Sequence, residues 1–195
     1  MDSPERRRRP LWHYLLIALA LTAAAALAER AMGRVWISKS GSVQLWQGKV
    51  NSPENSQHVS DWYTPSHVIH GIGFYGVFHL VGRGKWSVGL RLILAVALEA
   101  AWEVFENTPF TIERYRTATI ALDYYGDSVL NSVCDILACA GGFFLAWRLP
   151  VWASVAVVVL LEVGVLLAIR DNLTLNIVML IRPFESIKRW QSGAG

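Results

Sequence analysis

The sequence predicts an all-α integral membrane protein, a polytopic bundle of about five transmembrane helices followed by a C-terminal interfacial or re-entrant helix. Two observations predict this class. Hydrophobic residues make up 53% of the chain and charged residues only 17%, a composition too apolar for an ordinary soluble domain. Several apolar stretches also approach the roughly 20 residues that a helix needs to cross a hydrocarbon core. We therefore expect residues 1–195 to form one integral membrane domain, with the lipid bilayer as its partner.

The first predicted span covers residues 11–28 and follows a basic block, Arg6 to Arg9. Positive residues favour the cytoplasmic side, so residues 1–10 predict a cytoplasmic amino terminus. The stretch also resembles a signal peptide that ends in Ala26-Leu27-Ala28, but its apolar part is longer than the usual core of about 7 to 15 residues. We therefore expect it to be retained. No aromatic or basic groove accompanies the block, which argues against a nucleic-acid partner.

The second and third spans follow a mixed segment, residues 29–65, which we expect to form an external loop. The second span is predicted from Ser66 to Val81. The short basic turn Gly82–Lys85 then returns the chain on the cytoplasmic side. The third span runs from Trp86 to about Asn107, and Pro109 ends it.

The second half of the chain predicts two further spans, Asp127–Leu149 and Val151–Ile169, after an external loop at Thr111–Gly126. Leu173–Ile181 is apolar but too short to cross a bilayer, which suits an interfacial or re-entrant helix at the start of an amphipathic tail, residues 173–195. With five crossings the positive residues of this tail would lie outside, against the usual charge bias. Six crossings is therefore the alternative.

Ionisable residues recur at helical spacing near the outer ends of three predicted spans. A helix turns by about 100° per residue, so Glu99, Glu103 and Glu106 share one face of the third span. Similar polar faces are formed by His67 and His70 on the second span and by Asp127, Asn131 and Asp135 on the fourth. Because consecutive spans alternate in direction, we expect these faces to meet. Polar contacts that only join helices are one explanation, but ionisable residues at membrane depth are costly and usually mark a functional site.

Two chemistries fit histidines and carboxylates that meet in a membrane. In the first, His67, His70, Glu103 and Asp127 bind a divalent metal such as Zn²⁺ or Mn²⁺, which activates a water molecule. In the second, no metal is present, and the buried acids pass protons or bind a cationic substrate, with His70 paired to Glu103. The spacing permits both.

Residues of the loop after the third span are candidates for binding a substrate. They are Arg114, Arg116 and Tyr124. Arginines bind phosphate groups through paired hydrogen bonds, so the two arginines would suit a phosphate-bearing ligand. Contacts with lipid headgroups, or plain solvation, are the simpler explanation of the same arginines.

Four motifs resemble those of an uncharacterised family of bacterial multi-pass inner-membrane proteins. They are Asp61–Gly71, Trp102–Asn107, Asp123–Ser132 and Arg170–Asn176. The resemblance implies a bacterial inner (plasma) membrane location and supplies no activity. More remotely, the order of these motifs is similar to VanZ-like membrane proteins, which are associated with glycopeptide tolerance and the cell envelope. On that pattern the candidate catalytic positions are Asp61, His67, Glu103, Glu106, Asp127 and Asn131.

The leading functional hypothesis is a polar site, open to the external leaflet, that binds or hydrolyses a lipid-linked envelope substrate. Metal-assisted hydrolysis is its sharpest form, and the sequence leaves open whether the protein is an enzyme. The alternatives are a proton-coupled transporter or flippase and a non-catalytic membrane scaffold. The chain shows no internal repeat of the kind that many transporters use, which counts against a transporter unless a homo-oligomer supplies the second half.

Overall fold

The computed structural model describes residues 10–83, 85–119, 121 and 123–193. The basic block Arg6 to Arg9 and the end of the predicted tail, residues 194–195, lie outside the described residues. Within the described ranges the chain forms eight helices and no strand, and a single β-bridge joins Gln47 to Asp61. The predicted all-α class is confirmed.

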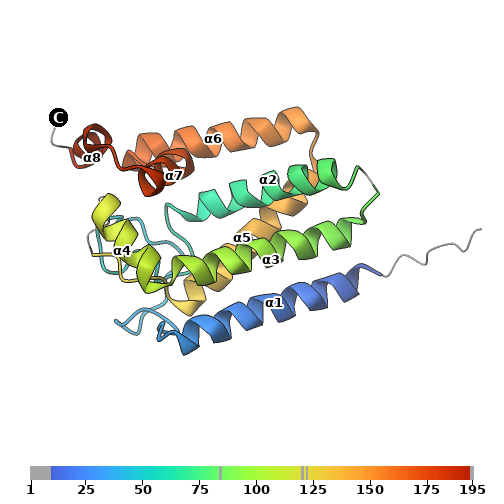
Figure 1. Ribbon diagram of the computed structural model, residues 1–195, viewed down its shortest axis with the longest axis horizontal. Helices are drawn as coiled ribbons and strands as arrows, with labels where there is room; N and C mark the ends of the chain where they lie inside the picture. The colour runs from blue at the N-terminus through green and yellow to red at the C-terminus, as the bar shows by residue number, and fades with distance from the viewer. Residues whose placement is uncertain (1–9, 84, 120, 122, 194–195) are drawn as a thin grey trace, which may run out of the picture.

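Five long helices lie lengthwise along the molecule, and three short helices gather at one end (Figure 1). The long helices are α1 (Leu11–Ala31), α2 (Thr64–Val81), α3 (Val88–Glu106), α5 (Val129–Arg148) and α6 (Val151–Ile169). The short helices are α4 (Pro109–Ala118), α7 (Leu173–Ile181) and α8 (Glu185–Gln191). The predicted spans end within three residues of the long helices, and the predicted short helix coincides with α7.

The predicted external loop Thr111–Gly126 is wrong in its first part, because helix α4 covers Pro109–Ala118. Proline suits the first turn of a helix, where its missing N–H would have no partner in any case. The Thr108 side chain caps this helix by accepting a hydrogen bond from the Thr111 backbone N–H. Pro109 therefore begins a new helix rather than a loop.

Serine caps position the starts of α3 and α5. Ser87 Oγ accepts a hydrogen bond from the Leu90 N–H, and Ser128 Oγ accepts one from the Asn131 N–H. These bonds satisfy backbone donors that have no partner within the helix. The Ser128 hydroxyl also donates to the Gln57 carbonyl oxygen at 3.0 Å, which fastens the long loop between α1 and α2 to the start of α5.

Helices α2 and α5 pack backbone against backbone through two glycines. A Cβ atom on Gly71 would lie under 3.0 Å from the carbonyl oxygen of Cys139, and one on Gly142 would lie equally close to the carbonyl oxygen of Val68. Small residues permit this approach between membrane helices. Other glycines of these helices face open space at the Cβ position, namely Gly73, Gly76 and Gly141. Since α2 and α5 run in the same direction, their amino-terminal ends lie together (Figure 1).

Among the described residues, three helices, α1, α5 and α6, are long and apolar enough to cross a membrane. Helix α6 exposes large apolar side chains along its length, including Val151, Leu160 and Leu167. Contiguous apolar surface of this kind is unusual on a soluble monomer. The structure therefore supports a membrane protein. Helices α2 and α3 are 18 and 19 residues long but fall outside this set, so the five-crossing topology stays a prediction.

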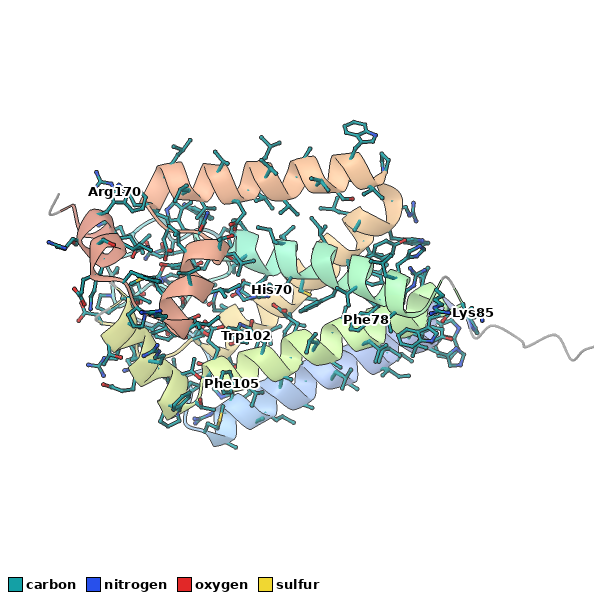
Figure 2. All side chains as sticks on the ribbon, turned by 45° about the horizontal axis from the view of Figure 1, so that its top comes forward. His70, Phe78, Lys85, Trp102, Phe105 and Arg170 are labelled. Carbon is teal, nitrogen blue, oxygen red and sulfur yellow. The ribbon has the colours of Figure 1, made fainter. Side chains whose placement is uncertain are left out.

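The interior of the bundle changes character along its length. Leu92, Val96, Ile136 and Phe143 form part of the buried apolar core that joins α3 to α5. Nearer the short helices the interior becomes polar and aromatic. Figure 2 shows His70, Trp102 and Phe105 on that side, whereas Phe78 and Lys85 lie toward the opposite end. The polar interior therefore lies in the half of the bundle that the short helices cover.

Candidate functional site

Glu99 of α3 holds both histidines of α2. Its Oε1 atom lies 2.6 Å from His67 Nδ1, and its two carboxylate oxygens lie 3.1 and 3.2 Å from His70 Nδ1. The sequence pattern suggested that His70 pairs with Glu103. The structure pairs it with Glu99, because α2 and α3 run in opposite directions and the deeper histidine meets the deeper acid.

Glu103 of α3 and Asp135 of α5 also contact His67. Glu103 Oε1 lies 3.3 Å from His67 Nδ1, and Asp135 Oδ2 lies 3.7 Å from His67 Nε2. Glu103 is 1% exposed and Asp135 is 4% exposed. Glu103 Oε1 and Asp135 Oδ1 have no hydrogen-bond partner in the part of the chain that the structure describes. Buried polar atoms are nearly always partnered, so these two oxygens are suited to a ligand.

Asp127 lies just before α5 and is held by neutral donors. Asn107 Nδ2 donates to Asp127 Oδ2 at 3.0 Å, and the Tyr124 hydroxyl donates to Oδ1 at 3.0 Å. The Asp127 backbone N–H donates in turn to Asn107 Oδ1 at 2.7 Å. Oxygens from Glu103, Glu106 and Asp127 lie within 4.8 Å of one another. This acidic group therefore extends from the C-terminal end of α3 to the start of α5.

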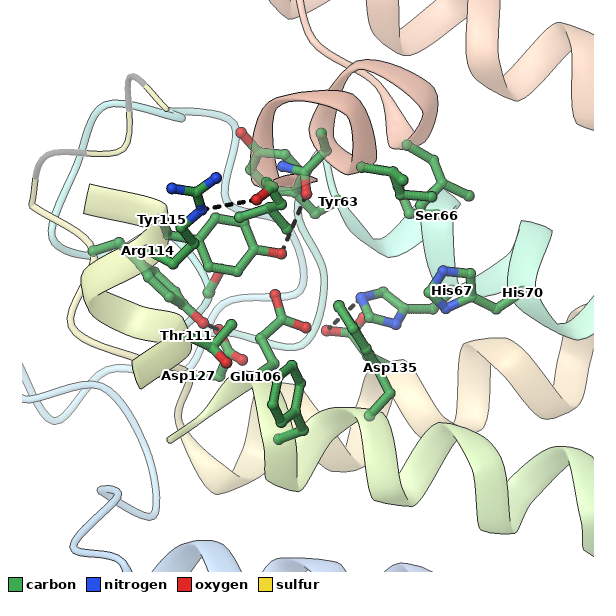
Figure 3. A pocket seen from close by; sticks show the side chains of 18 of the residues that line it. Tyr63, Ser66, His67, His70, Glu106, Thr111, Arg114, Tyr115, Asp127 and Asp135 are labelled. Atoms are coloured by element: carbon green, nitrogen blue, oxygen red, sulfur yellow. Dashed lines mark hydrogen bonds and ion pairs between the residues drawn. The ribbon is translucent and has the colours of Figure 1, made fainter. Parts of the chain in front are cut away.

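A cavity of about 810 Å³ opens beside these residues, between α2, α3, α4, α5 and α7. Its polar wall contains His67, His70, Glu106, Asp127, Asn131 and Asp135. Its apolar wall contains Phe74, Leu98, Trp102, Phe105, Phe110, Ile177 and Ile181. Figure 3 shows His67, Glu106, Asp127 and Asp135 around the same space. Glu99 and Glu103 are not part of the lining and lie behind the polar wall. The cavity is amphipathic, and it suits a ligand with one polar part and one long apolar part.

Acidic side chains outnumber cationic ones around the polar wall. The acids are Glu99, Glu103, Glu106, Asp127 and Asp135. Among the described residues, their ion pairs involve His67 and His70 only. Arg114 also lines the cavity, but its guanidinium donates to the carbonyl oxygens of Leu180 and Ile181 in α7. Buried charges are costly unless they are paired or bound to a metal, so this excess of acids favours a cation.

The phenols beside the acids remain hydrogen-bond donors. Burial raises the pKa values of Tyr115 and Tyr124 well above the ordinary value for tyrosine, and the nearby carboxylates act in the same direction. Their rings meet edge to face, with centroids 5.2 Å apart. Tyr115 donates to Asn176 Oδ1 at 3.2 Å, which links α4 to α7 over the cavity. Both tyrosines therefore keep their protons at neutral pH.

Two of the predicted catalytic residues anchor the long loop. Asp61 accepts hydrogen bonds from the Ser56 and Tyr63 N–H groups at 3.0 and 2.7 Å, and burial raises its pKa in spite of these bonds. Asp61 is not among the cavity-lining residues. Asn131 lines the cavity, and its Nδ2 donates to the His58 carbonyl oxygen at 2.9 Å. These hydrogen bonds give Asp61 and Asn131 a structural role in holding the loop. A catalytic role for either residue stays a prediction.

The predicted substrate-binding residues separate into two groups. Arg114 and Tyr124 line the cavity. Arg116 is exposed on α4 and is not part of the lining. The sequence pattern did not single out Asn107, although it lies four residues after Glu103 and therefore on the same helical face. That spacing is the signal from which its place beside Asp127 could have been inferred.

In the described part of the chain, three groups of side chains lie close enough together to be candidate metal ligands. The first contains His67, His70 and Glu99, the second His67, Glu103 and Asp135, and the third Glu103, Glu106 and Asp127. Within each group, one ligand atom from each residue lies within 4.8 Å of the others. The predicted ligands His67, His70, Glu103 and Asp127 all fall in these groups, but no single group contains them all. Glu99, Glu106 and Asp135, which were not among the predicted ligands, complete the groups.

Comparisons with known proteins identify the family. A family model described as a protein of unknown function, DUF2585, matches residues 29–193. A UPF0314 protein of Rhizobium meliloti is 55% identical over 193 residues, which cover 98% of this chain and 96% of the relative. UPF0314 proteins of Sinorhizobium fredii and Paracoccus denitrificans are each 53% identical, over 191 and 188 residues, which cover 98% and 96% of this chain and 96% and 94% of the relatives.

No solved structure significantly matches the chain. The predicted resemblance to an uncharacterised bacterial family is confirmed by the family model and the relatives, whereas similarity to VanZ-like proteins stays a prediction. The chain therefore belongs to the DUF2585 family of proteins of unknown function, together with the bacterial UPF0314 proteins.

Proposed function

We propose that this protein is a metal-dependent hydrolase in the bacterial inner membrane, acting on a lipid-linked substrate of the cell envelope. One observation carries the proposal. The amphipathic cavity meets a buried group, His67, Glu103 and Asp135, in which two carboxylate oxygens have no hydrogen-bond partner among the described residues. A divalent cation would satisfy both oxygens and offset the local excess of acids.

The contacts of His67 suit a metal ligand. Its Nδ1 lies 2.6 Å from Glu99 Oε1, which leaves Nε2 facing Asp135 Oδ2 at 3.7 Å. Metal-bound histidines usually donate their other ring N–H to a carboxylate, which holds the ring in place. Two ligand atoms on one tetrahedral ion at about 2.1 Å are separated by about 3.4 Å, close to the separation found here. Imidazole combined with carboxylates suits Zn²⁺ or Mn²⁺.

The chemistry follows from the ion and the acids of the polar wall. A bound divalent ion lowers the pKa of a coordinated water molecule and so forms hydroxide near neutral pH. Glu106 lines the cavity beside this group, and one oxygen of its carboxylate is placed to accept the proton of that water. Held by His67, Glu103 and Asp135, the ion would supply activated water for the hydrolysis of an ester or anhydride, in which a water oxygen bonds to the electrophilic atom while the bond to the leaving oxygen breaks. The proton held by Glu106 would then pass to that leaving oxygen.

The substrate class follows from the remaining cavity wall. Aromatic and aliphatic side chains from α2, α3, α4 and α7 line the apolar part of the cavity. An acyl or polyprenyl chain would fill this part and leave the hydrolysable bond near the ion. Pockets of about 300 to 1,000 Å³ hold small ligands, so the cavity is large enough for the reactive end of a lipid.

The topology completes the proposal. With five crossings and a cytoplasmic amino terminus, the starts of α2 and α5 and the end of α3 lie at the external face. The cavity would then open toward the external leaflet, where envelope precursors are used. The VanZ-like order of motifs agrees with a role in the envelope, and the bacterial relatives agree with a bacterial membrane.

A proton-coupled carrier is the second candidate, and one observation favours it. Glu99 contacts both His67 and His70, so three titratable groups on two helices form a continuous hydrogen-bonded chain. Such chains pass protons in transporters. A carrier of this kind would need no metal, which separates it from the hydrolase.

The test is metal analysis of the full-length protein purified in detergent and dialysed against a weak chelator. We expect near-stoichiometric Zn²⁺ or Mn²⁺ in the wild type and its loss in the double variant His67→Ala/Glu103→Gln. The matched control is His13→Ala/Glu113→Gln, which changes the same residue types outside the site. Size-exclusion profiles and thermal unfolding establish that all three proteins are folded.

Each outcome decides between the candidates. Metal retained in the wild type and the control but lost in the site variant supports the hydrolase and justifies a search among envelope lipids. Folded wild-type protein that takes up neither ion, even when both are supplied, contradicts it and favours the carrier or a scaffold. Metal that remains in the site variant places the ion elsewhere and contradicts the proposed ligands.

A further inference from the structure

We infer that Glu103, Glu106 and Asp127 form a second divalent-cation site beside the site of His67, Glu103 and Asp135, with the Glu103 carboxylate shared between the two ions. The inference rests on the proposed function, because it adds an ion to the same centre. Both groups bring one ligand atom from each residue within 4.8 Å of the others. Glu103 is the residue that belongs to both. Glu106 offers one carboxylate oxygen to the second ion, which leaves its other oxygen to take up the proton in the proposed hydrolysis.

The position of Glu103 supports the shared role. Its side chain is 1% exposed and lies behind the polar wall of the cavity. Its Oε1 atom has no hydrogen-bond partner among the described residues. His67 Nδ1 is 3.3 Å away but already lies 2.6 Å from Glu99 Oε1. A buried carboxylate oxygen in this position needs a cation that the surrounding side chains do not supply.

The surroundings of Asp127 leave room for an ion. Each carboxylate oxygen receives one hydrogen bond, Oδ2 from Asn107 and Oδ1 from Tyr124, both at 3.0 Å. Both donors are neutral, so they orient the carboxylate without balancing its charge. A carboxylate oxygen has a second lone pair, which remains for a metal. Donors of this kind commonly hold metal ligands in place.

The donor atoms indicate which ion each site takes. The second site offers carboxylate oxygens alone, which suit hard ions such as Mg²⁺ and Mn²⁺. The first site includes an imidazole, which also suits Zn²⁺. Ions that share a carboxylate in two-metal enzymes lie about 3.5 to 4 Å apart, a separation that a bridging Glu103 would span. The two sites should therefore differ in affinity for Zn²⁺ but both accept Mn²⁺.

The experiment uses Mn²⁺ alone as the probe, with full-length protein in detergent. Metal analysis measures the number of ions per chain, and electron paramagnetic resonance shows whether neighbouring ions are spin-coupled. We expect two coupled Mn²⁺ ions in the wild type. Glu106→Gln should retain one ion with the six-line signal of isolated Mn²⁺, and the exposed-site control Glu113→Gln should retain the coupled pair. If Glu106→Gln does not fold, Asp127→Asn tests the same site.

The outcomes separate this inference from the proposed function. One Mn²⁺ in the wild type, lost in His67→Ala but kept in Glu106→Gln, overturns the second site and leaves the proposed hydrolase standing. Two ions without spin coupling overturn the shared Glu103. Folded wild-type protein that binds no Mn²⁺ and no Zn²⁺ overturns both the second site and the proposed function.

Discussion

His67 Nδ1 and Glu99 Oε1 lie 2.6 Å apart in the buried contact between α2 and α3, while His67 Nε2 faces Asp135. The contact with Glu99 holds the imidazole ring. In the proposed site, a metal ion would replace the direct contact between His67 Nε2 and Asp135. Glu99 is therefore a positioning residue for the proposed site. It lies behind the cavity wall and not in the lining.

The first prediction concerns Glu99→Gln. The amide can still accept one hydrogen bond from a histidine, but it removes the carboxylate charge that favours the Nε2-coordinating form of His67. We expect the number of bound ions to be unchanged and the affinity for Mn²⁺ to fall by about 10- to 100-fold, the usual effect of losing such a partner. Titration with Mn²⁺ measures this, with Glu113→Gln as the control. An unchanged affinity would show that Glu99 does not orient the site.

The second prediction concerns the glycine contacts between α2 and α5. Gly71→Ala and Gly142→Ala each place a methyl group against a backbone carbonyl of the other helix, which cannot move as a side chain can. We expect each to destabilise the protein by about 3 kcal/mol, the upper part of the range for overpacking. Thermal unfolding in detergent measures the loss.

Matched controls exist on the same helices. Gly73→Ala and Gly141→Ala add the same methyl group where nothing lies within 4 Å. Alanine is favoured over glycine in a helix interior, so these variants should unfold at the wild-type temperature or slightly above it. Equal effects at Gly141 and Gly142 would contradict the close contact.

The third prediction concerns Asn131, which fastens the long loop to α5. Asn131→Ala removes the donor of the His58 carbonyl oxygen and leaves that buried oxygen without its partner. We expect a loss of about 1 to 3 kcal/mol and faster proteolysis between α1 and α2, because the loop would detach before the bundle unfolds. Asn51→Ala, at an exposed position in the same loop, is the control. Cleavage at the same rate in both variants would rule out the anchoring role.

The fourth prediction is a pH dependence at Asp171, between α6 and α7. Burial raises the pKa of this carboxyl, although it accepts hydrogen bonds from the Asn172 N–H, Tyr63 and Gln191. Between the ordinary aspartate pKa and this raised value, the folded protein binds more protons than the unfolded chain. Its contribution to stability is therefore greatest at low pH and decreases as pH rises through that window.

Asp171→Asn removes this dependence, because the amide cannot ionise and keeps an oxygen acceptor. We expect the unfolding temperature of the variant, relative to the wild type, to rise as the pH increases above the ordinary pKa of aspartate. Thermal unfolding across this range measures the difference, with the exposed Asp123→Asn as the control. A difference that stays constant with pH would show that Asp171 does not titrate differently in the folded protein.

Much of the fold could be predicted because the apolar stretches are long and well bounded. Pro150 and Arg170 flank α6, and the predicted span coincides with this helix. The polar faces could also be predicted, because residues three and four apart share a face of a helix. His67, Glu103 and Asp135 lie on three separate helices of the chain and meet as the alternating directions of the spans implied.

The details that were wrong or missing depend on contacts between elements. Helix α4 was predicted as loop because its sequence is polar and short, and its start depends on Thr108 and Pro109. The partner of His70 depends on how far α2 is displaced along α3. The helical periodicity of the sequence predicts which residues share a face but not this displacement. The environment of Asp61 depends on the local path of the loop, where two backbone N–H groups converge on its carboxylate.

The glycine contact between α2 and α5 has a consequence for the spacing within the site. His67 lies four residues before Gly71, and Asp135 lies four residues before Cys139, so each is one helical turn from the point where the two backbones touch. Because the helices run in the same direction, both steps lead toward the same end. The contact between the two main chains therefore sets the distance between the His67 imidazole and the Asp135 carboxylate. Changes in the volume of core side chains elsewhere would therefore leave this distance unchanged.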